Sequence, residues 1–290
     1  MARLGYVGLG IMGGPMARHL ATAKHSMTVY NRTTAKADVW VGQHGGARVL
    51  TPREVAQSSD VVLMCVGNDD DVRSVVFGAD GILAGLKTGG ILVDHTTASA
   101  TIAREIADAC AKQGCGFVDA PVSGGQAGAE NGQLTIMCGS NDSATFDAID
   151  PIIAAYAKRS KLLGTAGSGQ LAKMVNQICI AGIAQGLSEA LNFAMRAGLD
   201  PDDVVDVISK GAAQSWQMEN RAKTMVRNEF EFGFAVEWMR KDLGICFDEA
   251  SRNGAQLPMT EMVDKFYEEV VAMGGRRWDT SSLIARFTKK

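Results

Sequence analysis

The sequence predicts an α/β domain built on a doubly wound, mostly parallel sheet, followed by an all-helical domain. Two observations lead to this prediction. Up to residue 164, short apolar β-rich runs alternate with helical stretches, which is typical of parallel strands joined by crossover helices. After Gln170 such runs stop, and a long helix with apolar residues on most faces begins. A chain of 290 residues is long enough for about two domains, which we assign to residues 1–164 and 165–290.

The individual elements follow from local patterns along the chain. Predicted strands cover residues 4–7, 26–30, 61–66, 90–94 and 116–119, with later candidates at 134–138 and 161–163. The run 61–66 is apolar throughout, which is typical of a strand buried on both faces. Asn68 and the aspartates after it favour a helix start, and a further helix is expected at about 99–113. The long helix covers 170–196, and Pro201 is well placed to open the next helix.

Composition excludes several classes of function. Charged residues make up 21% of the chain, the formal net charge is −3, and basic residues are scattered, so no nucleic-acid-binding face is expected. The N-terminus enters a strand without a signal-peptide pattern, and no apolar run approaches the roughly 20 residues that span a bilayer. We therefore expect a cytoplasmic protein with no membrane partner.

The cysteines indicate the same compartment. They form no CxxC pair, and no histidine lies at metal-ligand spacing from them, so no metal site is expected. We interpret them as small buried apolar residues in a reducing compartment. They are Cys65, Cys110, Cys115, Cys138, Cys179 and Cys246.

The strongest functional signal is a glycine-rich turn between the first strand and the first helix. Gly8-Leu9-Gly10-Ile11-Met12-Gly13 follows the strand at 4–7 and precedes a helical pattern and a second strand at 26–30. In a Rossmann-type site, Gly8 permits the tight turn, Gly10 lets the backbone approach a pyrophosphate, and Gly13 lets the helix pack closely. Ile11 and Met12 lie at the helix N-terminus, which attracts phosphate. The pattern predicts a dinucleotide site; a purely structural glycine turn is the alternative.

The end of the second strand indicates which dinucleotide binds. NAD sites usually carry an acidic residue there, whereas NADP sites favour an arginine. Asn31-Arg32-Thr33 occupies this position, and no carboxylate follows until Asp38, inside the next helix. Because Arg32 can pair with a 2′-phosphate through a fork of donors, we predict NADP in preference to NAD. The alternative is that Arg32 is a solvated surface residue and that either cofactor binds.

Two further segments have the composition of a catalytic or substrate-binding site. Lys173 and Asn176 lie three residues apart near the start of the apolar helix, so they project from the same face. A partly buried lysine there needs a partner or a task, whereas an exposed one is an ordinary surface charge. The loop Asp119-Ala120-Pro121-Val122-Ser123-Gly124-Gly125 follows a strand at the carboxyl edge of the sheet and can hold a carboxylate or phosphate. A flexible glycine-rich turn is the alternative for this loop.

Together these segments resemble the β-hydroxyacid dehydrogenases, the group of 3-hydroxyisobutyrate dehydrogenase, tartronate semialdehyde reductase and the glyoxylate/succinic semialdehyde reductases. The matching segments run in the family's order along essentially the whole chain, at residues 8–13, 119–125, 167–170, 173–176 and 241–243. The resemblance implies an NADP(H)-dependent oxidoreductase that interconverts a small hydroxy acid and its semialdehyde or oxo acid. It also implies that the helical domain binds substrate and mediates dimerisation.

The resemblance assigns roles to individual residues. Lys173 matches the lysine that acts as general acid and base, and Asn176 matches the residue that orients the substrate. Substrate binding is implied at Ser123, Gly124, Gly125 and Lys241. Besides the glycine turn and Asn31, Arg32 and Thr33, cofactor contacts are implied at Val66, Thr97 and Lys241.

Other readings stay open beside this one. A 6-phosphogluconate-type oxidative decarboxylase carries a histidine where this chain has Val175, and imine reductases generally replace the lysine retained here as Lys173. A catalytically silent NADP-binding module is the alternative from a different class. Its weakness is that Lys173 and Asn176 are both intact.

Substrate and assembly are not decided by the sequence. Hydroxyisobutyrate, tartronate semialdehyde, glyoxylate, succinic semialdehyde and serine all carry a small carboxylate two or three bonds from the reacting carbon. Trp216 and Arg221 match a helix that closes the substrate pocket in relatives, with a core tryptophan and a surface arginine as the alternative. His95 is left without a role. The apolar helix predicts a large intersubunit or interdomain interface, so we expect a homodimer or a homotetramer.

Overall fold

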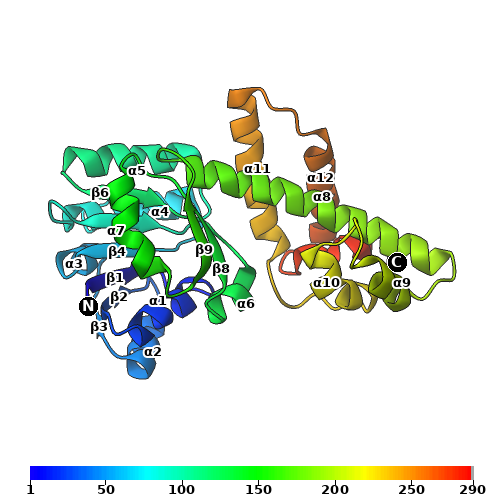
Figure 1. Cartoon of the computed structure of the whole chain (residues 1–290), viewed down its shortest axis with the longest axis horizontal. Coiled ribbons are helices and arrows are strands. Elements are labelled where there is room, and N and C mark those ends of the chain that lie inside the picture. The colour runs from blue at the N-terminus through cyan, green and yellow to red at the C-terminus, as the bar shows by residue number, and fades with distance from the viewer. Residues whose placement is uncertain (289–290) are drawn as a thin grey trace. The chain divides into compact units, whose positions relative to one another are not determined.

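A computed structural model describes residues 1–288, which form two compact units (Figure 1). The α/β unit spans Met1–Lys173, and the helical unit begins at Met174. Lys289 and Lys290, which the sequence analysis assigned to the helical domain, lie outside the described residues. The architecture confirms the predicted fold class, a Rossmann-type parallel sheet with helices followed by an all-helical part.

The main sheet of the α/β unit has six parallel strands in the order β3-β2-β1-β4-β5-β6. Their bounds are β1 (Arg3–Val7), β2 (Ser26–Tyr30), β3 (Ala47–Arg48), β4 (Val61–Met64), β5 (Ile91–Asp94) and β6 (Gly116–Asp119). β1 pairs with β2 on one side and with β4 on the other, so the strand order reverses at β1. In open α/β sheets ligands bind outside the carboxyl ends of the strands at such a reversal. The glycine-rich turn follows β1 at this point.

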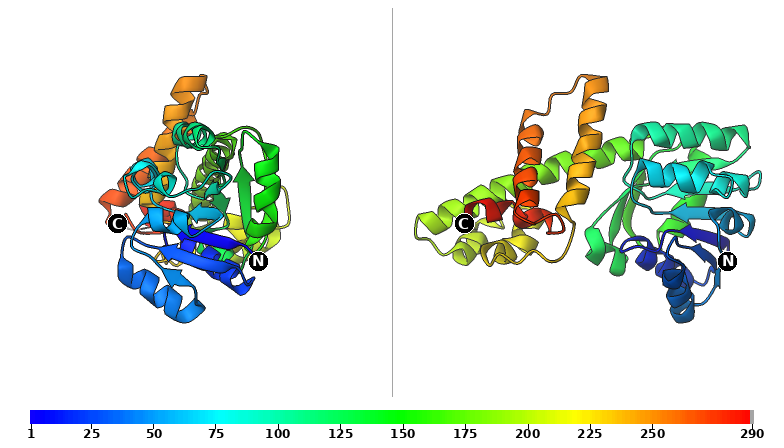
Figure 2. Two further views of the ribbon diagram at one scale, coloured as in Figure 1. Left: turned by 90° about the vertical axis from the view of Figure 1, so that its left-hand side faces the viewer. Right: turned by 180° about the vertical axis from the view of Figure 1, so that it is seen from behind.

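Helices cover both faces of the main sheet (Figure 2). They are α1 (Gly13–Thr22), α2 (Thr34–His44), α3 (Pro52–Gln57), α4 (Asp69–Phe77), the short 3-10 helix η1 (Ile82–Ala84) and α5 (Ala100–Lys112). α1 and α2 pack with Leu63 on one face, whereas α3, α4 and α5 pack with Val62 and Met64 on the other. β4 is therefore buried on both faces, as its apolar run predicts. Asn68 and Ser99 cap α4 and α5, which confirms the predicted helix starts.

The later strand candidates form a second sheet of their own. β7 (Val122–Ser123) pairs antiparallel with β8 (Leu134–Cys138), which pairs parallel with β9 (Ala157–Leu162). The strand candidate at 134–138 is confirmed as β8, and the candidate at 161–163 overlaps β9, which begins earlier, at Ala157. Both strands belong to this second sheet and not to the main one. The start of β9 shows no apolar pattern in the sequence, because this is an edge strand on which Lys158, Arg159 and Lys161 are exposed. Two helices flank this sheet, α6 (Gly125–Glu130) and α7 (Ser143–Ile153).

The helical unit is organised around the long helix α8 (Ser168–Arg196). The other elements are α9 (Pro201–Ile208), α10 (Trp216–Val226), α11 (Val236–Asn253), α12 (Pro258–Ala272), the 3-10 helix η2 (Thr280–Ile284) and α13 (Ala285–Thr288). Ala181 and Ala184 of α8 pack in one apolar cluster with α11 and α12, and Leu187 and Leu191 pack in another with α9 and α10. Two clusters on successive stretches explain why α8 is apolar on most faces. Pro201 opens α9, as predicted.

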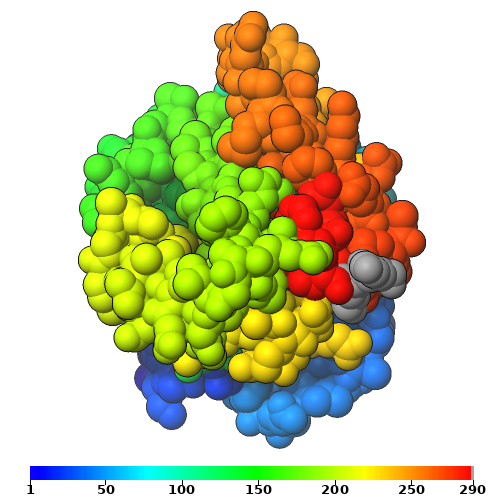
Figure 3. All heavy atoms as spheres, turned by 90° about the vertical axis from the view of Figure 1, so that its right-hand side faces the viewer, coloured from blue at the N-terminus to red at the C-terminus, as the bar shows by residue number. Residues whose placement is uncertain are grey.

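The surface of the helical unit bears on two expectations from the sequence and corrects one of them. Among the described helices, α8 alone is long and apolar enough to meet the length and composition of a membrane span, although core helices of soluble proteins meet the same criteria. Cys179 of α8 is exposed beside the exposed Val175 and Ile183, so the expectation that every cysteine is buried is wrong. Cys65 is half-buried, and the other four cysteines are buried as expected. The loop between α11 and α12 stands out from the rest of this unit (Figure 3).

Candidate active site

The glycine-rich turn has the geometry of a dinucleotide loop. Gly8 adopts φ +95°, which favours glycine, and a Cβ there would collide with the Cys65 carbonyl oxygen. A Cβ on Gly13 would collide with the Gly8 carbonyl oxygen, because α1 starts directly against the turn. In contrast, a Cβ on Gly10 would meet nothing within 4 Å. The chain itself fills the space at Gly8 and Gly13, whereas the space at Gly10 is open, which fits a pyrophosphate.

The start of α1 adds an electrostatic reason for an anion to bind here. Met12 occupies the cap position of α1, its side chain makes no capping hydrogen bond, and the first turn carries no acidic residue. Ile11 precedes it and is 58% exposed. Backbone N–H groups at a helix N-terminus attract phosphate. The turn and the first turn of α1 can therefore hold the pyrophosphate of a dinucleotide together.

Asn31 fixes the glycine-rich turn from the end of β2. Its Oδ1 accepts the Leu9 N–H at 2.9 Å, and its Nδ2 donates to the Thr33 carbonyl oxygen at 3.0 Å. The Gly8 N–H also donates to the Tyr30 carbonyl oxygen at 2.9 Å, so two bonds join the turn to the strand. The contact between Asn31 and the cofactor stays a prediction. The structure adds a positioning role for this side chain.

Arg32 has a partner that lies far from it in sequence, Asp71. Its Nη1 lies 3.1 Å from Oδ1 of Asp71, in the first turn of α4, and its side chain is 85% exposed. Thr33 beside it is exposed as well. The carboxylate that follows next in sequence, Asp38, pairs with Arg48 instead. The ion pair between Arg32 and Asp71 therefore joins the residue after β2 to the helix that follows β4, the two strands that pair with β1.

Buried hydrogen bonds tie the loops after β4 and β5 to the start of α8. The Val66 N–H donates to Thr96 Oγ1 at 3.0 Å. Gln170 donates from Nε2 to the Thr96 carbonyl oxygen at 2.8 Å and accepts the Ala98 N–H through Oε1 at 3.1 Å. Gln170 is only 1% exposed, so these bonds are shielded from water. They hold Val66 and Thr97, two predicted cofactor contacts, on loops anchored to α8.

The carboxylate of Asp119 anchors the same helix start to β6. It accepts the Gly167 N–H through Oδ1 at 2.7 Å and the Gln170 N–H through Oδ2 at 2.9 Å. Burial raises the pKa of the Asp119 carboxyl to about 6, although the N–H donors favour its charged form. A carboxylate at a helix N-terminus also interacts favourably with the helix dipole. Lys173 follows Gln170 by one turn, so its position along the helix is fixed through this anchor.

Lys173 is buried, so it is not an ordinary surface charge. Its relative exposure is 7%, near the start of a helix otherwise rich in apolar residues. Burying an ammonium group is costly unless it is partnered or has a task. Lys173 is the last residue of the α/β unit, and Asn176 follows in the helical unit on the same helix.

The loop after β6 contains the predicted carboxylate site. Ser123 ends β7, and Gly124 and Gly125 follow with φ +134° and +61°, values that favour glycine. A Cβ on Gly125 would meet nothing within 4 Å. The structure therefore places all three residues together on one turn that a small ligand can approach.

His95, which had no role from the sequence, supports this loop from inside. Its Nδ1 lies 2.6 Å from the Ala120 carbonyl oxygen, and its Nε2 lies 2.8 Å from the Tyr156 hydroxyl. The carbonyl can only accept, so Nδ1 carries the proton and Nε2 accepts the tyrosine O–H. Burial lowers the pKa of His95 to about 4, which keeps the ring neutral. His95 thus joins Ala120, at the start of the predicted carboxylate loop, to Tyr156, the residue just ahead of β9.

A polar network in the helical unit joins two more predicted site residues. Asn176 Nδ2 donates to Gln177 Oε1 at 2.8 Å, and Gln177 Nε2 donates to Asp242 Oδ2 at 2.6 Å. Lys241 Nζ lies 3.0 Å from Asp242 Oδ1. Gln177 and Asp242 are both 2% exposed. Asn176 on α8 and Lys241 on α11 are therefore linked through two buried side chains to which the sequence analysis gave no role.

Comparisons with known proteins cover nearly the whole chain. Residues 3–167 match the model for the NAD binding domain of 6-phosphogluconate dehydrogenase, and residues 167–287 match NAD-binding of NADP-dependent 3-hydroxyisobutyrate dehydrogenase. An uncharacterized oxidoreductase of Shewanella frigidimarina is 61% identical over 289 residues, covering 100% of this chain and 99% of the relative. The 2-hydroxy-3-oxopropionate reductase of Escherichia coli is 34% identical over 282 residues, covering 97% of this chain and 96% of that enzyme. A structure of Mycobacterium tuberculosis 3-hydroxyisobutyrate dehydrogenase with L-serine has a TM-score of 0.89 at 28% identity, with 99% of each chain covered.

The chain belongs to the β-hydroxyacid dehydrogenase family. This confirms the family that the order of the motifs predicts, and it identifies the chain as an oxidoreductase that binds a nicotinamide dinucleotide. The α/β unit of this β-hydroxyacid dehydrogenase contains the glycine-rich turn, Arg32, Ser123 and Lys173. Its helical unit contains Asn176 and Lys241.

The alternative of a core Trp216 and a surface Arg221 is wrong for both residues. Trp216 is 52% exposed, so it is not a core tryptophan. The Arg221 guanidinium lies 4.7 Å from the Trp216 ring centroid and 4.9 Å from that of Phe232, and its side chain is only 19% exposed. Arg221 Nε also lies 3.2 Å from Oδ1 of the buried Asp279. The arginine is therefore an internal support, and the tryptophan is the surface group.

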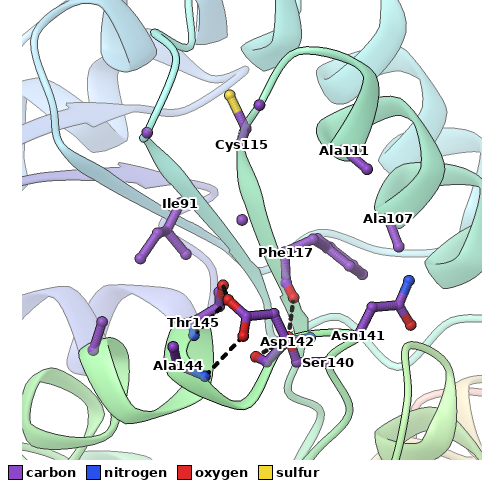
Figure 4. Close-up of a pocket in the computed structure, with 14 residues that line it drawn as sticks. Ile91, Ala107, Ala111, Cys115, Phe117, Ser140, Asn141, Asp142, Ala144 and Thr145 are labelled. Atoms are coloured by element: carbon purple, nitrogen blue, oxygen red, sulfur yellow. Dashed lines mark hydrogen bonds between the residues drawn. The ribbon is translucent and has the colours of Figure 1, made fainter.

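A cavity of about 430 Å³ in the α/β unit is separate from the candidate site of the β-hydroxyacid dehydrogenase (Figure 4). Ile91 and Phe117 line it near the amino ends of β5 and β6, together with Ala107 of α5 and Thr145 of α7. The glycine-rich turn and the loops after β5 and β6 lie at the opposite, carboxyl ends of these parallel strands. The polar groups drawn in this cavity bond to one another or to the backbone, as in the capping of α7 by Asp142.

Proposed function

We propose that the chain is an NADP(H)-dependent reductase of small aldehydes that carry a carboxylate, and that it also acts in reverse on the corresponding hydroxy acids. One observation supports this most directly. Lys173 is buried at the start of a helix that Gln170 and Asp119 anchor to the loops after β5 and β6. These loops contain Thr97 and Ser123, so the anchor relates the proposed acid to the proposed cofactor and carboxylate sites.

The preference for NADP rests on Arg32. It is the first basic residue after β2 and is 85% exposed, so its guanidinium can reach a 2′-phosphate. Gly10, in the turn that Asn31 holds against the end of β2, offers open space for the pyrophosphate. When bound, the nicotinamide ring supplies the hydride for the carbonyl carbon.

The residues of the chain would then handle the proton and the orientation of the substrate. Ser123 and the N–H groups at Gly124 and Gly125 hold the carboxylate. Lys173, as an ammonium, donates a hydrogen bond to the carbonyl oxygen and transfers a proton as negative charge develops there. Asn176 orients the same end of the substrate. In the oxidative direction the Lys173 amine accepts the hydroxyl proton.

The names of relatives support this class of substrate. The Escherichia coli relative is named for the reduction of 2-hydroxy-3-oxopropionate, and the Mycobacterium tuberculosis neighbour for the oxidation of 3-hydroxyisobutyrate. Both molecules are small carboxylates with the reacting carbon close by. We propose glyoxylate, succinic semialdehyde, methylmalonate semialdehyde and tartronate semialdehyde as the first compounds to test.

The experiment measures NADPH oxidation by the purified protein with each aldehyde and repeats every assay with NADH. We expect turnover of at least one aldehyde, with loss of about a hundredfold or more in Lys173→Ala, because positioned proton transfer contributes that much. NADPH binding measured by calorimetry should stay within about twofold of the wild type. Lys158→Ala, which removes an exposed lysine of β9, is the matched control and should retain full activity. Wild-type turnover in Lys173→Ala would refute the assignment.

A further inference from the structure

The ion pair between Arg32 and Asp71 lies where cofactor choice is made. Arg32 follows β2, Asp71 is in the first turn of α4 after β4, and β1 lies between these two strands. A contact of 3.1 Å between the two side chains therefore joins both sides of the dinucleotide turn. Both partners remain accessible, with side-chain exposures of 85% and 30%. A ligand that reaches Arg32 thus also meets a carboxylate.

The position of Asp71 is defined by its helix, which makes the contact more than a chance surface encounter. Its N–H donates at 2.9 Å to Oδ1 of Asn68, the cap of α4. Three aspartates follow this cap, and they differ in their contacts. Asp69 accepts the N–H of Ser99 at 2.9 Å and its hydroxyl at 2.5 Å, and Asp70 is exposed. Asp71 is the one among them that faces the guanidinium.

A carboxylate and a guanidinium side by side have opposite preferences for the two dinucleotides. A carboxylate accepts a hydrogen bond from the ribose 2′-hydroxyl of NAD and repels the 2′-phosphate of NADP. A guanidinium pairs with the 2′-phosphate and does not need the hydroxyl. An exposed ion pair is weak, so a phosphate with two charges can displace Asp71 from Arg32. The carboxylate nevertheless opposes phosphate binding through both competition and repulsion.

We infer that Asp71 is a specificity-determining residue that lowers the preference for NADP set by Arg32 and allows the enzyme to use NAD as well. The inference rests on the proposed role of Arg32 at the 2′-phosphate. Asp71 weakens the binding of the phosphorylated cofactor, and it supplies the acceptor that an NAD site needs and that the end of β2 lacks. Both effects raise the affinity for the NAD form of the cofactor relative to the NADP form.

The test compares dissociation constants of NADPH and NADH, measured by calorimetry, for the wild type and four variants. Asp71→Asn removes the charge and keeps the shape of the side chain. We expect it to bind NADPH about fivefold more tightly and to bind NADH no better, which is the scale of one exposed ion pair. Asp70→Asn removes the same charge one residue away and should change either constant less than about twofold, because salt screens exposed charges. Thermal unfolding of each variant checks that the fold is kept.

Arg32→Ala distinguishes a failure of the inference about Asp71 from a failure of the proposal that Arg32 binds the 2′-phosphate. If Arg32→Ala weakens NADPH binding and Asp71→Asn has no more effect than Asp70→Asn, the inference is overturned and the role of Arg32 stands. If Arg32→Ala leaves NADPH binding unchanged, the proposed NADP contact fails and the inference fails with it. In the double variant Arg32→Ala/Asp71→Asn the gain from the second change should shrink, since the competition for Arg32 is gone. A full gain in the double variant would refute competition for Arg32.

Discussion

Replacing Gly10 with alanine should separate the stability of the fold from the binding of the cofactor. Gly10 has no positive φ, and a Cβ at this position would meet nothing within 4 Å. A glycine-to-alanine change at a compatible position stabilises a protein by about 0.4–1 kcal/mol, because the unfolded chain loses conformational freedom. For a unit of this size the melting temperature should rise by about 1–4 °C.

The same methyl group would occupy the open space that we assign to the pyrophosphate. We expect the dissociation constant of NADPH to rise at least about tenfold, equivalent to about 1.4 kcal/mol. Differential scanning calorimetry gives the stability, and isothermal titration calorimetry gives the affinity. A more stable protein that binds its cofactor more weakly is the expected result.

Two matched variants complete this experiment. Gly42→Ala changes another glycine without positive φ, in α2, where a Cβ also meets nothing within 4 Å, so it should leave NADPH binding unchanged. Gly8→Ala places a Cβ against the Cys65 carbonyl oxygen at φ +95° and should destabilise the fold by more than about 1 kcal/mol. NADPH binding of wild-type strength in Gly10→Ala would show that the dinucleotide does not lie against this turn.

Three further predictions follow from buried groups. His95, with a pKa lowered to about 4, binds its proton more readily in the unfolded chain, so its contribution to the free energy of unfolding should fall by up to about 3 kcal/mol as the pH is lowered from 6.5 to 4. Asp94 and Asp119, whose pKa values burial raises to about 7 and about 6, contribute in the opposite direction over this range, so the prediction concerns the difference between the wild type and a His95 variant. The free energy of unfolding, measured by urea denaturation at each pH, should depend differently on pH in His95→Gln, which lacks the loss that His95 causes at low pH. The same pH dependence in both proteins would contradict the assignment. Gln177→Leu should lower kcat about tenfold or more with NADPH affinity unchanged, because the amide of Asn176 loses the partner that orients it; unchanged kcat would exclude that role. Arg221→Ala should lower the free energy of unfolding by about 3 kcal/mol, since the buried Asp279 loses the guanidinium that balances its charge and keeps the hydrogen bonds from Phe234 and Ser281. A loss below about 1 kcal/mol in chemical denaturation would contradict this.

The features predicted best from the sequence are those that depend on neighbouring residues in the chain. The glycine-rich turn, the cap at Asn68 and the start of α9 at Pro201 each need only a few consecutive residues, and the structure has them as expected. The apolar run of β4 is predicted for the same reason, because burial on both faces requires apolar side chains at every position.

The features missed depend on contacts between distant segments. Asp71 reaches Arg32 only because β2 and β4 flank β1, and the sequence around either residue does not predict that strand order. Gln177 and Asp242 look like ordinary polar positions of two helices until packing buries them against each other. The first residues of β9 carry no apolar signal, because charged side chains cover this edge strand, so the sequence predicts a strand only from Lys161.

The anchoring of α8 by Asp119 also bears on how such a protein could be divided or recombined. A cut after residue 164 would leave Asp119 buried without the N–H groups of Gly167 and Gln170 that it binds. A cut after Lys173 would keep this anchor within the α/β unit. The boundary between the two compact units thus lies inside the continuous helix α8 and not in the loop that precedes it. An exchange of helical halves between relatives would therefore have to keep the first turns of α8 with the sheet that fixes them.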